Sequence, residues 1–194
     1  NRFLKNEITR EHIEGIDDWE ENNTSTIYME QESKTIVNKV ESKDVGMMYS
    51  MNPYAGCEHG CIYCFARPTH AYMGLSAGLD FETKLFAKSD AARLLERELS
   101  RPGYEPKTIA IGTNTDPYQP IEKQRRIMRD ILEVLDAANH PVGIVTKSAL
   151  VTRDIDILSR MASRGLAKVA LSVTTLDRKL ARTMEPRAAT PGGT

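Results

Sequence analysis

Asn52-Pro-Tyr-Ala-Gly-Cys57-Glu-His-Gly-Cys61-Ile-Tyr-Cys64-Phe65 is the stretch that decides the fold, because it holds all three cysteines of the 194-residue chain. Three thiolates spaced C-x3-C-x2-C can each bind one iron of a cubane 4Fe-4S cluster. The fourth iron then lacks a protein ligand and can bind a small molecule, as an open metal site in an enzyme does. We therefore predict that Cys57, Cys61 and Cys64 bind a 4Fe-4S cluster.

Other interpretations of the same loop are less consistent with the sequence. A structural zinc ion needs four closed ligands, for which His59 or His70 is a candidate fourth, but zinc modules usually pair two ligand clusters and no second C-x2-C is present. A disulfide is disfavoured because three is an odd number and the cysteines lie close together. Three inert buried cysteines in one glycine-containing loop would be unusual core chemistry.

Length and composition set broad limits. The chain is long enough for one sizeable core, and its net charge of -1 gives no global attraction to nucleic acid. It contains no apolar run of membrane-spanning length and no signal-peptide pattern. Iron-binding thiols need a reducing compartment, so we expect a cytoplasmic protein. The chain starts without Met and ends in Ala-Thr-Pro-Gly-Gly-Thr, and we expect both ends to be cuts through a longer protein.

Residues 1–45 are polar and charged, and we expect them to form an N-terminal extension before a core at residues 46–194. Two short β-type runs, at 26–29 and 35–40, predict a β-hairpin packed on the core. A solvated extension is an equally good interpretation of this segment.

From residue 46 the pattern alternates between strands and helices. Ala91, Leu94, Leu95 and Leu99 share one helical face, and Ile155, Leu158, Met161 and Ala162 share another. Ser89 or Asp90 is expected to cap the first helix. The expected strands are 47–51, 107–111, 141–146 and 168–173, with a β excursion at 80–88, and the expected helices start near 89, 122, 155 and 176, the second reaching 139.

Such strand-helix units predict an α/β fold with a parallel sheet, either barrel-like or open and doubly wound. The cysteine loop after the first strand favours a partial parallel (β/α) barrel. Four units are visible, and we expect the C-terminal part of the barrel to be missing.

Three strands turn polar at their C-terminal ends, which is where a parallel barrel places its active site. The polar segments are 112–120, 146–148 and 172–175. Taken singly, each has a plain explanation: Asp116-Pro117 forms turns, Lys147 extends to solvent, and Thr175 caps a helix. Taken together, they favour a binding site.

The cysteine spacing, with Tyr63 and Phe65 flanking the last cysteine, resembles the signature of the radical S-adenosylmethionine (SAM) enzymes. For that ligand, Lys147 can neutralise the carboxylate, Ser172 and Thr113 offer hydroxyls, and Asp116 can accept from the ammonium or ribose. The ring of Tyr63 can border the adenine. The predicted cofactor-binding residues are Tyr63, Thr113, Asn114, Asp116, Lys147, Ser148 and Ser172.

A wider resemblance covers residues 46–191 and rests on four segments: the cysteine loop, 112–116, 146–148, and Ser172 with 185–187. These segments resemble the spore photoproduct lyase branch of the radical SAM superfamily, and more closely its photolyase-like members. By that resemblance Cys57, Cys61 and Cys64 hold the cluster, and Tyr63, Thr113, Lys147 and Ser172 match positions that contact SAM in the lyase. It also implies a DNA or RNA substrate and an electron donor such as flavodoxin or ferredoxin.

The chain departs from the lyase pattern in two ways. The lyase uses a further cysteine as hydrogen donor, but the matching place here is Ile111, and no cysteine remains outside the loop. Tyr118 is a speculative substitute donor. Radical SAM barrels usually have six strand-helix units, whereas four are visible here, and we expect the last two beyond Thr194.

The function expected from these features is reductive cleavage of SAM to a 5'-deoxyadenosyl radical that abstracts hydrogen from a substrate. Lys123, Arg125, Arg126 and Arg129 form a basic segment that suits a nucleic-acid substrate, although a solvated face is the commoner role of such charges. The rival hypotheses are a non-enzymatic binding module stabilised by zinc or a cluster, and an electron-transfer iron-sulfur protein.

Overall fold

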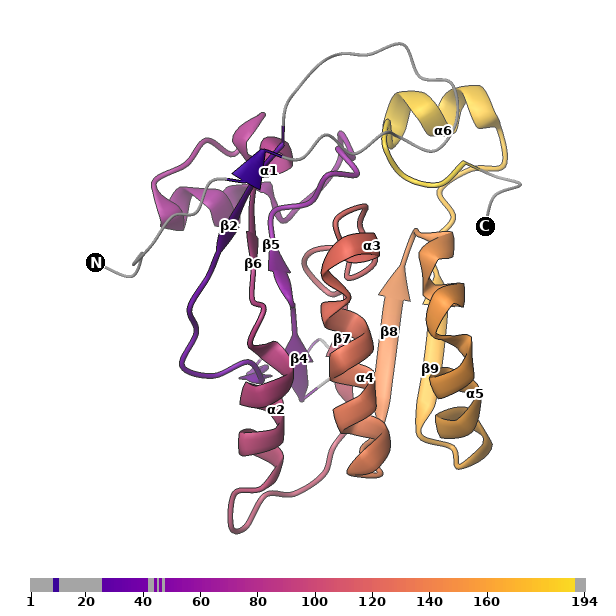
Figure 1. Cartoon of the computed structure of the whole chain (residues 1–194). Coiled ribbons are helices and arrows are strands. Elements are labelled where there is room, and N and C mark those ends of the chain that lie inside the picture. Colours follow the sequence, from indigo (N-terminus) through magenta and orange to yellow (C-terminus); the bar gives the residue numbers. More distant parts are fainter. Residues whose placement is uncertain (1–8, 11–25, 42–43, 45, 47, 191–194) are drawn as a thin grey trace.

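A computed structural model describes residues 9–10, 26–41, 44, 46 and 48–190, and it shows a mixed α/β fold. Within this part of the chain the larger sheet has five strands, of which β4, β7, β8 and β9 run parallel and β3 pairs antiparallel with β4 (Figure 1). In spatial order they are β3 (Asn38–Lys39), β4 (Tyr49–Met51), β7 (Ile109–Ile111), β8 (Val142–Thr146) and β9 (Ala167–Leu171). The expected parallel α/β architecture is confirmed, and the described strands do not close into a barrel.

The second sheet has four strands in the order β1-β2-β6-β5. The chain passes directly from β4 of the first sheet to β5 of the second. Only Asn52 and Pro53 separate β4 from β5, so the cysteine loop starts at the junction of the two sheets. Strands β2 and β6 are parallel, and the outer pairs are antiparallel. The strands are β1 (Thr9–Arg10), β2 (Ile27–Glu30), β5 (Tyr54–Ala55) and β6 (Lys84–Ala87).

Three helices cover one face of the larger sheet and form the core with it (Figure 1): α2 (Ala91–Leu99), α4 (Ile127–Ala137) and α5 (Ile155–Ser163). Their apolar residues meet the inward residues of β7 and β8, and each fully buried Leu or Ile contributes about 1.5–3 kcal/mol. The fully buried contributors include Leu94, Leu95, Ile109, Ile111, Met128, Ile131, Leu132, Leu135, Ile157 and Met161.

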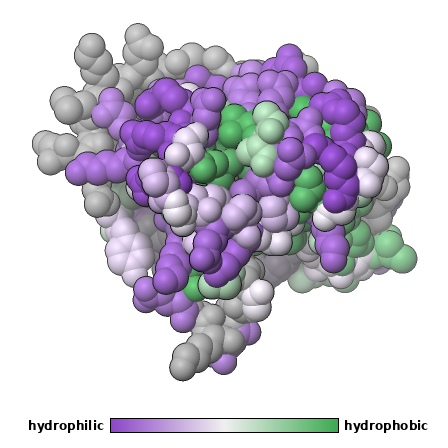
Figure 2. All heavy atoms as spheres, turned by 90° about the horizontal axis from the view of Figure 1, so that it is seen from below, coloured by the Kyte–Doolittle hydropathy of each residue, from purple (hydrophilic) through white to green (hydrophobic). Residues whose placement is uncertain are grey.

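The opposite face of the sheet is open in the described part of the chain, since Val145 of β8 and Val169 and Leu171 of β9 are each more than two-fifths exposed. Figure 2 shows the molecule from below, where hydrophilic side chains dominate and apolar ones form smaller patches. None of the described helices is long and apolar enough to cross a membrane. The remaining helical elements are η1 (Arg67–Met73), α1 (Asp80–Thr83), α3 (Glu122–Arg125), η2 (Ala149–Asp154) and α6 (Arg178–Met184).

The hairpin expected at 26–29 and 35–40 is not formed, because its two strands belong to different sheets. Strand β2 pairs with β1 and β6, whereas β3 pairs with β4. Nor is this segment merely solvated, since Tyr28 and Ile36 are buried in the core. Residues 11–25, which include Trp19, lie outside the described part of the chain.

Several local expectations are also corrected. The β excursion at 80–88 begins with helical α1 before β6, and β5 was not expected. The helix expected from 122 to 139 is divided into α3 and α4 at Arg126, whose φ of 55° is left-handed. In α5 it is Ile157, Leu158 and Met161 that are buried, while Ile155 and Ala162 are exposed. Asp90 stands at the start of α2 without a capping side-chain bond.

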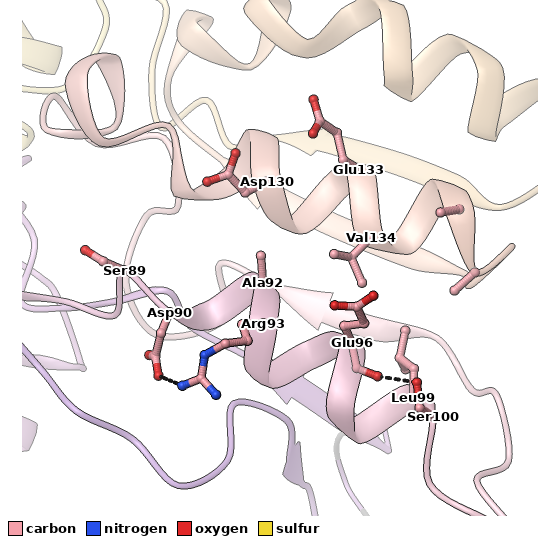
Figure 3. A pocket seen from close by; sticks show the side chains of 12 residues that line it. Ser89, Asp90, Ala92, Arg93, Glu96, Leu99, Ser100, Asp130, Glu133 and Val134 are labelled. Carbon is pink, nitrogen blue, oxygen red and sulfur yellow. Dashed lines mark hydrogen bonds and ion pairs between the residues drawn. The ribbon is translucent and has the colours of Figure 1, made fainter.

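A groove separates α2 from α4 on the outer helical layer (Figure 3). Carboxylates line both of its sides, among them Glu96 from α2 and Asp130 and Glu133 from α4, and Asp90 forms an ion pair with Arg93 at 2.7 Å. None of the predicted cofactor-binding residues lines this groove, so it is separate from the expected site.

The buried histidines predict a loss of stability in acid. The ring of His140 accepts from the Tyr104 hydroxyl at Nε2 (2.8 Å) and donates from Nδ1 to the Pro141 carbonyl (3.0 Å), and burial lowers its pKa. The pKa values of His59 and His70 are lowered by burial as well. The ordinary pKa of histidine is about 6.5, and below that pH the unfolded chain binds more protons at these histidines than the folded chain does. The contribution of the neutral histidines to stability is therefore complete above pH 6.5 and is lost as the pH falls below it.

We therefore expect the free energy of unfolding to fall as pH decreases from 6.5 towards 5, by at most about 1.4 kcal/mol per pH unit for each histidine. Denaturant titrations of the wild type and of His140→Gln measure this slope. The variant is expected to have the shallower slope, and equal slopes would show that His140 does not contribute.

Candidate active site

The cysteine loop follows β5 and packs into the molecule. Cys57 and Cys61 are buried, Cys64 is more exposed, and all three are free thiols. The backbone turns at Gly56 with a φ of 82°, where an added Cβ would lie only 2.5 Å from the Leu85 side chain. A loop of this shape therefore requires glycine at that position.

The three sulfur donors of the loop are of the chemical kind that holds an iron-sulfur cluster. No three His, Cys, Asp or Glu side chains converge on an ion position anywhere in the described residues. Of the two candidate fourth ligands for zinc, His70 is engaged, because its Nε2 is bonded to the Lys84 carbonyl at 2.9 Å, whereas His59 Nδ1 has no hydrogen-bond partner in the described part of the chain and lies 3.5 Å from Asp116 Oδ2. Burial and the nearby Asp116 raise the pKa of Cys57, and burial together with Glu185 raises that of Cys61 to about 11. Metal binding must therefore displace protons from these thiols.

Two arginines hold the outer part of the loop. Arg67 of η1 donates to the Cys61 carbonyl at 2.9 Å, and the Arg187 backbone N–H donates to the His59 carbonyl at 3.1 Å. Both guanidinium groups pair with the carboxylate of Glu82. The segment after α6 is thus joined to η1 and α1 across this loop.

A polar cluster lies beside the loop at the ends of β8 and β9. Lys147 Nζ donates to Ser172 Oγ at 2.9 Å and forms an ion pair with Glu185 at 2.7 Å. It also lies over the ring of Tyr63, 5.6 Å from the ring centroid. The Tyr63 hydroxyl is 2.8 Å from Thr174 Oγ1 and donates to Glu185. The narrow pocket at this cluster is lined by Lys147, Ser172, Val173, Thr174, Thr175, Ala181, Glu185 and Ala189.

Of the predicted binding residues, Tyr63, Lys147 and Ser172 meet in this cluster, whereas the carboxylate of Asp116 accepts hydrogen bonds from other groups of the protein. Its Oδ1 accepts from Thr146 Oγ1 (2.6 Å) and its Oδ2 from the Lys147 backbone N–H (2.7 Å). Oδ1 also accepts from the Tyr118 N–H at 2.9 Å. Since both oxygens already bind the protein, Asp116 ties the segment after β7 to the end of β8.

The other predicted residues are dispersed. Ser148 caps η2 by accepting from the Leu150 N–H, and the Asn114 N–H donates to Asn52 Oδ1 at 3.2 Å. Thr113 lies half-buried on the same segment. Tyr118 is fully buried and donates to Asp154 at 3.1 Å, so its hydroxyl is not open to a substrate.

The basic segment of the sequence is partly neutralised. Arg125 pairs with Glu30 at 3.0 Å, and Arg129 pairs with Asp156 at 2.7 Å. Lys123 and Arg126 are exposed. A nucleic-acid surface built from all four cations is therefore not what the structure presents.

Sequence reasoning did not include Thr174 or Glu185 among the binding residues. Thr174 lay inside the polar segment 172–175, so its position offered a signal. Glu185 belonged to the segment 185–187 that carries the family resemblance, but its contact with Lys147 was not predicted, because only the return of the chain after α6 brings its carboxylate there.

Comparison with known proteins places the chain in a family. The model of the radical SAM superfamily matches residues 51–192. The chain is 40% identical over 159 residues to an uncharacterized protein of Mycobacterium tuberculosis and 28% identical over 145 residues to one of Methanocaldococcus jannaschii. These matches cover 81% and 75% of this chain but 47% and 51% of the relatives, so the chain spans about half of their length.

Solved structures of spore photoproduct lyase have a similar fold. The lyase complexed with dinucleoside spore photoproduct matches with a TM-score of 0.62 and 18% identity. A mutant with bound AdoMet and dinucleoside spore photoproduct matches with 0.63 and 16%. Each comparison covers 94% of this chain and 51% of the lyase. At this level of identity the likeness shows the fold.

Asp116 is expected to stabilise the site rather than to bind ligand directly. Asp116→Asn replaces an acceptor oxygen by an N–H2 group that faces other donors, and a buried donor left unpaired costs about 1–3 kcal/mol. Denaturant unfolding should show a loss of this size, whereas Asp130→Asn on the exposed side of α4 should change stability by less than about 0.5 kcal/mol. Equal stability of the two variants would contradict this role.

Proposed function

The chain belongs to the radical SAM superfamily, and from this we propose that Cys57, Cys61 and Cys64 hold a 4Fe-4S cluster at which S-adenosylmethionine is reductively cleaved. The observation that carries the proposal is the contact between the loop and the polar cluster. Tyr63, which lies between two of the cysteines, bonds to Thr174 and Glu185, and the Ile62 N–H donates to the Met184 carbonyl at 3.0 Å. The cysteine loop and the polar cluster are therefore adjacent, and this supports the proposal that they act as one site.

A cluster held by Cys57, Cys61 and Cys64 would supply the electron for the reductive cleavage of SAM to methionine and a 5'-deoxyadenosyl radical that abstracts hydrogen. The chain's own contribution is charge and hydrogen bonding. Lys147 already binds a carboxylate, that of Glu185, and we propose that the carboxylate of SAM replaces it there. The hydroxyls of Ser172 and Thr174 lie beside the ammonium group of Lys147, and the ring of Tyr63 borders the site.

We further propose a substrate of the nucleic-acid class, because the structurally similar lyase binds a dinucleoside photoproduct. The reductant would be a flavodoxin or ferredoxin, and the compartment the reducing cytoplasm. Ile111 is fully buried at the place where the lyase resemblance would put a hydrogen-donating cysteine, so this position supplies no thiol. The proposed organisation is an extension at 1–45 and a radical SAM core at 46–194.

Anaerobic reconstitution with iron and sulfide tests the proposal directly. We expect a brown chain whose reduced electron paramagnetic resonance spectrum changes when SAM is added, with 5'-deoxyadenosine formed in the same tube. Cys61→Ser should lose both signals because it removes one of three ligands. Bound zinc without iron would overturn the proposal, and a cluster signal indifferent to SAM would support electron transfer instead.

The role of Lys147 predicts a loss of SAM affinity. Lys147→Gln should weaken SAM binding to the reconstituted chain by about tenfold, equivalent to about 1.4 kcal/mol, because a charge-assisted contact is lost. Calorimetry of SAM binding measures it. Lys168→Gln, at an exposed position of β9, is the matched control. The double variant Lys147→Gln/Glu185→Gln removes the buried carboxylate of Glu185, which Lys147→Gln alone would leave without its ion-pair partner. Unchanged affinity in both Lys147 variants would contradict the assignment.

A further inference from the structure

The side-chain amide of Gln119 joins the two peptide groups on either side of Cys57. Its Oε1 accepts from the Glu58 N–H at 3.0 Å, and its Nε2 donates to the Gly56 carbonyl at 3.2 Å. Gln119 is fully buried. The two bonds also fix the orientation of the amide, because a flipped amide would place donor against donor and acceptor against acceptor.

The remaining backbone contact of Cys57 completes this arrangement. Its own N–H donates to the Phe81 carbonyl at 2.9 Å. The polar backbone groups around Cys57 are thus held by Gln119, which follows β7, and by Phe81 of α1. Cys64 differs, because its N–H donates to Cys61 O at 3.2 Å, within the loop itself, and its side chain is more exposed.

Gln119 is itself held firmly. Its carbonyl accepts from the Glu122 N–H at 2.9 Å, at the start of α3. The fully buried carboxylate of Glu122 accepts from the Tyr54 hydroxyl and from Arg153, which joins α3 to β5 and to η2. Gln119 is therefore linked through Glu122 to Tyr54 of β5, the strand that precedes the cysteine loop.

We infer that Gln119 is a positioning residue that fixes Cys57 as a cluster ligand before the cluster is bound. The inference rests on the proposed function and adds to it a residue that lies outside the predicted cofactor-binding set. Loss of the amide would leave two buried backbone groups without partners, and they would turn towards other partners and move Cys57 with them. Since hydrogen bonding and solvent access near the sulfurs set the potential of a cluster, the loaded site would change too.

Thiol alkylation of the metal-free chain tests the inference without any cluster. The alkylation rate of each cysteine is followed by mass spectrometry in the wild type, in Gln119→Leu and in Thr115→Val. Thr115 is the control because it is buried and donates to the Tyr54 carbonyl at 2.8 Å, so its loss removes a bond of the same segment that does not flank Cys57. We expect the Cys57 rate relative to that of Cys64 to rise about tenfold in Gln119→Leu and to stay within twofold in Thr115→Val.

Gln119→Met is a second apolar variant, unbranched and close to glutamine in shape, and serves where Gln119→Leu does not fold. It also removes both hydrogen bonds to the groups beside Cys57, so the ratio should rise as in Gln119→Leu. In the reconstituted chain, both Gln119 variants should also shift the electron paramagnetic resonance signal and the midpoint potential of the cluster, which Thr115→Val should not.

An unchanged alkylation ratio in the Gln119 variants, or the same change in Thr115→Val, would overturn the inference. A wild-type chain that takes up no iron would overturn the proposed function alone. The ratio is measured without metal, so it would still decide whether Gln119 fixes Cys57.

Discussion

The site depends on the close approach of two strand ends at Gly112. Its φ of 88° turns the chain after β7, and a Cβ there would lie 2.0 Å from the Val145 carbonyl oxygen of β8, so no other residue fits. This approach places Asp116 against Thr146 and Lys147. The segment beyond it then reaches β5 through Thr115 and the cysteine loop through Gln119. The absence of a side chain at Gly112 thus allows the cysteine loop and the polar pocket to be held by the same segment of the chain.

A buried charge network reinforces this support from the helical side. Glu122 and Asp154 are fully buried, and Arg153 contacts both at 2.7 Å. Isolated buried charges would be strongly unfavourable, but these are paired and also accept hydrogen bonds from Tyr54 and Tyr118. Such a network contributes little net stability compared with apolar packing. Its geometry instead restricts how α3, η2 and β5 can be placed relative to one another.

The sequence was sufficient for features that depend on local spacing. The three cysteines, the strands expected at 107–111 and 141–146, and the apolar face of α2 all follow from the order of neighbouring residues. The hairpin prediction failed because Ile27 pairs with Lys84 and Asn38 with Ser50, and distant partners leave no local pattern. The break at Arg126 was likewise not predictable, since it follows from the Glu122 carboxylate accepting from the Met128 N–H at 3.1 Å.

Burial of the cysteine loop has two consequences that support one another. A raised pKa keeps Cys57 and Cys61 neutral in the metal-free chain, so the folded loop carries no unpaired thiolate in a poorly solvated place. Neutral buried thiols also react slowly with oxidants and alkylating reagents. Ligand binding then requires deprotonation, and the positive charge of iron is what makes it favourable. A loop held by Gln119, Arg67 and Arg187 can remain in place through this change, because its anchors bind backbone carbonyls and N–H groups rather than the sulfurs.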